Sequence, residues 1–170
     1  MNHFKTIVPV AFLTMFFLCG LSPSVGAQYF AVPPGAQAIS NPYCGAPTYR
    51  VWNEPRRGGI NFVGGNGPVF ITVAHSLGAG SPVERAVLAH ECGHVARRHG
   101  LNSGFYGQIR QKELEADCFA ASILAQRRDR SALIAFRQMV GSCGTFSSGP
   151  PGYPTCNERL STINQCAGGM

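Results

Sequence analysis

The chain has 170 residues, 45% of them hydrophobic and 13% charged, with a formal net charge of +6 at pH 7. This length suits one domain with a single buried core. The positive charge is modest, and no stripe of basic and aromatic residues accompanies it, so we expect no nucleic-acid partner. The positive charge is compatible with binding to an anionic envelope or membrane surface.

Residues 1–27 have the features of a secretory signal peptide. Lys5 gives the positive start, the apolar run after it is too short to span a bilayer comfortably, and small residues lead up to Ala27. We expect cleavage after Ala27 and a mature chain that is secreted or periplasmic. An uncleaved membrane anchor is the alternative.

Residues 28–47 are rich in Pro, Ala and Gly, and we expect an extended leader there, followed by one folded domain at 48–170. The domain begins with short β-type runs that are separated by turn residues. They lie at 48–52, 60–63 and 69–74. These runs predict a small antiparallel sheet.

Helices are expected at 82–98, 108–127, 131–140 and 156–166. Ser81 can cap the first helix, Glu84 can return the capping-box bond, and Gly100 is its expected left-handed stop. Thr155 and Glu158 form a second capping box before the last helix. The sequence therefore predicts an α+β fold in which a small sheet is followed by packed helices.

The motif H-E-x-x-H, here HECGH, lies in the first of these helices. Residues four apart share a helix face, so His90 and His94 can bind one ion. Glu91 lies about 100° further round the helix, where it can act on a water without binding the metal. This arrangement suits metal-assisted hydrolysis, which also needs a third protein ligand and an open coordination position.

The third ligand is expected within the sequence ELEAD on the next helix, which holds three of the chain's eight acidic residues. Glu113 and Asp117 share a helix face, so Glu113 can complete the metal site while Asp117 supports a ligand histidine. Glu115 is the alternative ligand. On a continuing helix His99 would point about 180° away from His90, which leaves His99 a solvent or helix-end role.

The motif pair HECGH and ELEAD resembles H-E-x-x-H and E-x-x-A-D of the gluzincin zinc metallopeptidases. The likeness is to the family of the CAAX prenyl endopeptidases, the HtpX-type envelope proteases and their soluble relatives. ImmA-type regulators carry a similar pair. Only 18 residues separate His94 from Glu113, so the chain resembles a soluble, trimmed member. The resemblance implies that Glu113 is the third Zn²⁺ ligand, and it implies a minimal zincin-like fold with 69–74 as the substrate-binding edge strand.

The family often carries His-Pro followed by Glu-Arg and a short helix, with the His and Arg near the substrate. In GYPTCNERLSTI, Tyr153 stands at the His position and Arg159 matches the Arg. The resemblance thus implies catalytic roles for both, and the Tyr153 hydroxyl could donate to a developing oxyanion. The alternatives are a packed loop aromatic for Tyr153 and a structural ion pair for Arg159.

Six of the seven cysteines follow Ala27, which suggests up to three disulfides in an exported protein. Cys92 and Cys118 point away from the ligand faces, so each is a core thiol or a disulfide. Cys44 faintly resembles the thiol of a cysteine switch, with a disulfide as the alternative. We expect at least one bridge in the C-terminal region from Cys143, Cys156 and Cys166.

The sequence therefore predicts an exported, monomeric zinc endopeptidase that acts on peptide or unfolded protein substrates, with Glu91 activating the water. The alternative is a secreted, disulfide-stabilised zinc-binding protein that serves as a binding or chaperone module. A purely structural zinc site would be closed by a fourth protein ligand, so the intact Glu91 favours the enzyme.

Overall fold

The computed structural model describes residues 32–54, 57–62, 69–99, 108–142 and 151–168. Within these ranges the strands are β1 (Gln37–Ile39), β2 (Thr48–Val51), β3 (Gly58–Phe62) and β4 (Val69–Ala74). A 3-10 turn, η1 (His75–Leu77), leads to the helices α1 (Pro82–Ala96), α2 (Ile109–Gln126), α3 (Arg130–Gly141) and α4 (Cys156–Cys166). The α+β class is confirmed, and the predicted helices are all present.

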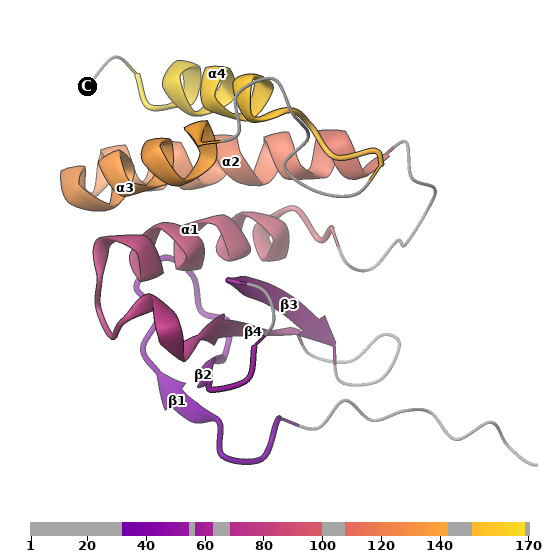
Figure 1. The fold of residues 1–170 in the computed structure, drawn as a ribbon, viewed down its shortest axis with the longest axis vertical. Coiled ribbons are helices and arrows are strands. Elements are labelled where there is room, and N and C mark those ends of the chain that lie inside the picture. Colours follow the sequence, from indigo (N-terminus) through magenta and orange to yellow (C-terminus); the bar gives the residue numbers. More distant parts are fainter. Residues whose placement is uncertain (1–31, 55–56, 63–68, 100–107, 143–150, 169–170) are drawn as a thin grey trace, which may run out of the picture.

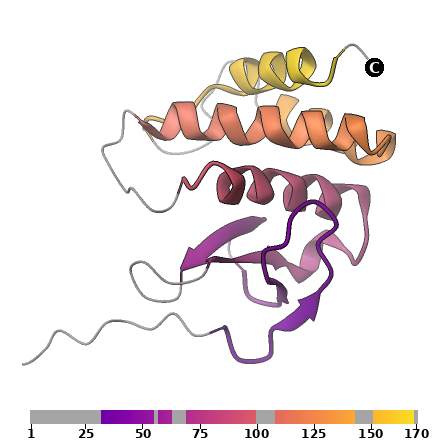
Figure 2. The same cartoon turned by 180° about the vertical axis from the view of Figure 1, so that it is seen from behind.

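The helices are stacked in layers on one face of the sheet (Figures 1 and 2). Helix α1 lies between the sheet and the pair α2 and α3, and α4 packs on the outer side of that pair. Because α1 is covered from both sides, it is buried along most of its length rather than on one stripe. The core joins β4, α1, α2 and α3 through side chains that include Ile71, Leu88, Leu124 and Phe136.

The sheet is mixed rather than antiparallel throughout, with strand order β1-β2-β4-β3. Strands β1 and β3 pair antiparallel with their neighbours, whereas β2 and β4 pair in parallel. The predicted edge strand at 69–74 is therefore wrong, because β4 lies between β2 and β3. Its burial fits this central position: the neighbours Ile71 and Thr72, which point to opposite faces of the sheet, are 0% and 2% exposed. The sheet edge beside α1 is β3.

The described part of the predicted leader belongs to the packed domain. Strand β1 pairs with β2, and Tyr43 is only 7% exposed within the hydrophobic core. Cys44 is bound to Cys92 of α1 by a disulfide. Strand pairing, core packing and a disulfide thus attach this segment to the domain. The predicted signal peptide, residues 1–27, lies outside the described residues.

The two helix starts predicted by capping boxes differ in one bond. Thr155 and Glu158 form the complete box before α4. Ser81 caps α1 by accepting from the Glu84 amide at 3.0 Å, as expected. The Glu84 carboxylate, however, accepts from the Gly80 amide at 2.6 Å and binds the Arg50 guanidinium of β2 at 2.8 and 3.0 Å. A buried cation that local sequence cannot reveal therefore redirects this side chain.

Disulfides connect distant parts of the described chain. Cys44–Cys92 and Cys118–Cys166 each join residues 48 positions apart, which confirms the disulfide interpretation of Cys92 and Cys118. Cys156 is also disulfide-bonded, and Cys143 lies outside the described residues. Because Cys44 is oxidised, it cannot act as a thiolate switch in this form.

These bridges fit an oxidising, extracellular environment. Among the described helices, none is both long and apolar enough to cross a bilayer.

Candidate metal centre

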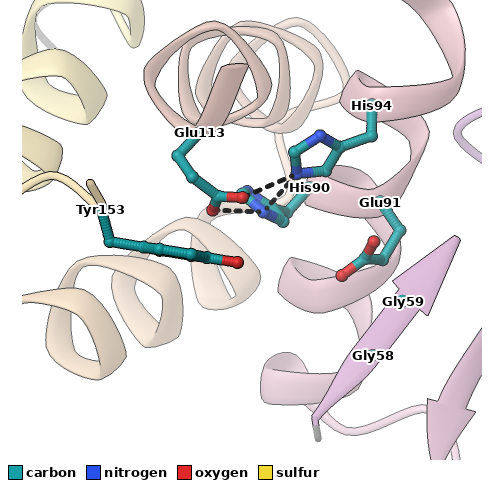
Figure 3. A pocket seen from close by; sticks show the side chains of 7 residues that line it. All are labelled: Gly58, Gly59, His90, Glu91, His94, Glu113 and Tyr153. Carbon is teal, nitrogen blue, oxygen red and sulfur yellow. Dashed lines mark hydrogen bonds and ion pairs between the residues drawn. The ribbon is translucent and has the colours of Figure 1, made fainter. Parts of the chain in front are cut away.

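Two helices bring three ligand atoms to one point (Figure 3). Nε2 of His90 and Nε2 of His94 on α1 lie 3.1 Å apart, and each lies 3.5 Å from a carboxylate oxygen of Glu113 on α2. Around an ion bound at about 2.0–2.2 Å, tetrahedral geometry places ligand atoms roughly 3.3–3.6 Å apart. The two separations from Glu113 fall within this range, and the separation of the two Nε2 atoms is about 0.2 Å shorter, so the group could hold one metal ion after a small rearrangement.

A close contact between the two helices makes this convergence possible. A Cβ added at Gly93 would lie 2.8 Å from both Cα and the carbonyl oxygen of Ala116. Ala116 is itself fully buried on α2. The small residues of HECGH and ELEAD therefore face each other and allow the histidines and Glu113 to meet.

His90 is supported from behind by a buried acid. Oδ1 of Asp117 lies 2.9 Å from Nδ1 of His90, close enough to form an ion pair when His90 is protonated. The Arg159 guanidinium donates two hydrogen bonds of 2.7 Å to the Asp117 carboxylate, whose side chain is fully buried. The supporting position predicted for Asp117 is observed, and Arg159 forms the structural ion pair that the sequence left open.

The charges of this group favour a cation at its centre. Burial alone would lower the pKa of His90, but the carboxylates of Asp117 and Glu113 outweigh burial and raise it. Burial alone would raise the pKa of Glu113, but the interactions with His90, His94 and Arg159 together outweigh burial and lower that pKa. Burial and the charge of His90 together lower the pKa of His94. The group thus stabilises one positive charge, on protonated His90, and disfavours a second, on His94.

Glu91 lies beside the ligand group and not within it, as the helix geometry predicted. It lines a cavity together with the ligand residues and with Gly58 and Gly59 of the edge strand β3 (Figure 3). A Cβ at Gly58 would lie 3.1 Å from Oε1 of Glu91 and 2.6 Å from Cγ1 of Val87. Strand β3 therefore crosses α1 in direct contact with the side chain that would act on water.

Tyr153 lines the same cavity from the segment that precedes α4. Figure 3 shows its ring extending toward the cluster, with the hydroxyl pointing into the space between Glu113 and Glu91. Arg159 is not among the residues that line this cavity. Of the two positions implied by the family resemblance, Tyr153 lines the cavity, whereas Arg159 approaches the ligand group with a guanidinium nitrogen 3.9 Å from Oε2 of Glu113.

His99 is the residue that helix geometry misplaced. Helix α1 ends at Ala96, and Arg98 takes a left-handed conformation with φ of 56°, so the chain turns back. Nδ1 of His99 then lies 2.9 Å from Nδ1 of His94, and its Nε2 lies 3.0 Å from Oε2 of Glu115. His99 does not point away, and Glu115 binds it instead of joining the ligand group.

Comparisons of the chain with family models, curated proteins and solved structures found no match. The chemistry of the site must therefore be argued from its own geometry.

Proposed function

We propose that the protein is an exported zinc-dependent endopeptidase that resembles the gluzincins. The observation that carries this proposal is the convergence of His90, His94 and Glu113 at near-tetrahedral spacing, with Glu91 beside them in a cavity. Two imidazoles and one carboxylate are the protein ligands typical of hydrolytic zinc sites, which keep a fourth position for water or substrate. Zinc, when bound there, would polarise the scissile carbonyl and make a water acidic enough to lose a proton near neutral pH.

The chain's own groups would supply the remaining chemistry. Glu91 would take a proton from the attacking water and pass it to the leaving amine. The Tyr153 hydroxyl is directed into the cavity, where it could donate to the carbonyl oxygen as negative charge develops. Asp117 and Arg159 would hold the His90 ring in position.

The edge strand suggests how a substrate would bind. In the described sheet β3 pairs only with β4, so its other edge is available to an extended chain. A peptide that adds to this edge would gain backbone hydrogen bonds and would pass directly over Glu91. Such recognition depends little on side chains, which fits a monomeric enzyme acting on peptides or unfolded proteins in a secreted or periplasmic location.

The proposal is tested with the purified mature chain, residues 28–170, and a library of unstructured peptides. We expect about one zinc per chain by metal analysis. Glu91→Gln should retain zinc and lose about 10²- to 10⁴-fold in turnover, because the proton acceptor is removed while the ligands remain. Glu54→Gln is the matched control, since Glu54 binds Thr72 outside the ligand group and should leave turnover unchanged.

Unchanged hydrolysis by Glu91→Gln would refute the catalytic role of that residue. A wild-type protein that binds zinc but cleaves no peptide in the library would instead favour the alternative, a non-catalytic zinc-binding module.

A further inference from the structure

We propose that His99 and Glu115 are positioning residues that fix the tautomer and orientation of His94, so that its Nε2 faces the metal. The inference rests on the metal centre of the proposed function and does not require peptidase activity. Its basis is the continuous chain of contacts from Glu115 through His99 to His94.

When His99 is neutral, the contacts allow one assignment of protons. The ionised Glu115 carboxylate can only accept, so Nε2 of His99 must donate across the 3.0 Å contact. A neutral His99 then has a lone pair on Nδ1, which accepts from Nδ1 of His94 at 2.9 Å. With its proton on Nδ1, His94 keeps the Nε2 lone pair free, and that atom belongs to the ligand group. A ligand histidine needs this tautomer.

Both His99 and Glu115 are held in place in this series of contacts. The His99 side chain is only 7% exposed, and its backbone amide donates to the carbonyl of His94 at 3.0 Å. Oε1 of Glu115 accepts from Nε2 of Gln111 at 2.7 Å, which leaves Oε2 directed at His99. The left-handed turn at Arg98 brings these groups together after α1 has ended.

The two ligand histidines are therefore supported in parallel ways. His90 has a carboxylate next to its Nδ1, that of Asp117. His94 reaches a carboxylate through a second imidazole. Outer partners of this kind orient the ring and increase its basicity, and their loss typically costs 10- to 100-fold in metal affinity.

Two substitutions at His99 separate its two contacts. His99→Asn places an amide oxygen near the position of Nδ1 and can still accept from His94. His99→Gln places an amide nitrogen near the position of Nε2, so it keeps the contact with Glu115 but loses the acceptor for His94. We expect His99→Gln to weaken zinc affinity about 10- to 100-fold, with His99→Asn remaining closer to the wild type. Affinity is measured by competition with a chromophoric chelator on the full mature chain.

A spectroscopic measurement separates positioning from general destabilisation. In zinc-loaded protein with ¹⁵N-labelled histidine, the Nδ1 proton of His94 should give a slowly exchanging signal that is lost in His99→Gln. The same substitutions at His75, which stacks on Trp52 at 3.4 Å between ring centroids, are the matched controls. They should change neither zinc affinity nor the His94 signal.

If the His99 variants fail to fold, Glu115→Gln tests the same chain of contacts. An amide can donate as well as accept, so it no longer dictates the His99 tautomer, and zinc affinity should fall below that of the His75 controls. Wild-type affinity in folded His99→Gln, or in Glu115→Gln, would overturn the inference. Zinc binding without peptide cleavage would defeat only the proposed function, whereas a wild-type chain that binds no zinc would overturn both.

Discussion

Replacing Gly93 by Ala tests whether close contact between α1 and α2 forms the metal centre. The added Cβ would lie 2.8 Å from backbone atoms of Ala116, whereas ordinary contacts begin at 3.4 Å. No side-chain rotation can relieve a contact with backbone, so the helices must separate by roughly 0.2 Å to reach the shortest contact that occurs and by roughly 0.6 Å to reach an ordinary one. Helix propensity alone would favour Ala over Gly by about 1 kcal/mol, whereas overpacking costs about 1–3 kcal/mol. The net change in unfolding free energy should therefore be a loss of at most about 2 kcal/mol.

Zinc affinity should respond more strongly than stability. Metal–ligand distances tolerate deviations of only about 0.2 Å, so a 0.6 Å displacement of α2 would remove Glu113 from its bonding position. The assay combines urea unfolding of the metal-free protein with a zinc titration. Gly141→Ala on α3 is the matched control, because its Cβ would meet Cδ2 of Leu160 at an ordinary 3.5 Å. If Gly93→Ala kept both the stability and the zinc affinity of the wild type, the close contact would not be what forms the site.

Three further changes have definite expected results. Arg50→Ala should lower the free energy of unfolding by about 3–5 kcal/mol in urea, because it leaves the carboxylate of Glu84, 2% exposed, without its cation. Gly58→Ala should lower peptide turnover while zinc content stays constant, because the new Cβ would displace Glu91 and not the ligands. Removal of zinc with a chelator should lower the melting temperature, since an ion present at 100 times its Kd stabilises the fold by about 2.7 kcal/mol; an unchanged melting temperature would contradict a native metal site.

Local sequence patterns predicted most helices and strands and the residues of the ligand group. The run VFITVA forms β4 over its whole predicted length, and the capping box at Thr155 starts α4 where expected. Helix periodicity placed Glu113 and Asp117 on one face, because residues four apart share a face, and the family resemblance implied Glu113 rather than Glu115 as the ligand. Spacing within one helix or strand was enough for the element bounds and for the shared faces, whereas the meeting of α1 and α2 depends on the contact of Gly93 with Ala116.

The errors arose where distant segments decide the outcome. Parallel pairing of β2 with β4 depends on strand order, which short apolar runs do not encode. The Arg50 side chain that redirects Glu84 comes from a strand 34 positions earlier in the sequence. The predicted orientation of His99 was wrong because the helix does not continue to Gly100. The chain changes direction at Arg98, which has a positive φ that this residue type rarely adopts.

The helical turn from His90 to His94 contributes to both the packed interior and the candidate metal centre. All five of its residues are buried, and successive positions contact different partners. The histidines face Glu113, Glu91 faces β3, Cys92 is bonded to Cys44, and Gly93 contacts α2. The middle of a helix placed between a sheet and two other helices exposes little surface to solvent, so successive 100° steps there meet other structural elements. The two residues between Glu91 and His94, Cys92 and Gly93, are therefore constrained by the disulfide and by packing against α2.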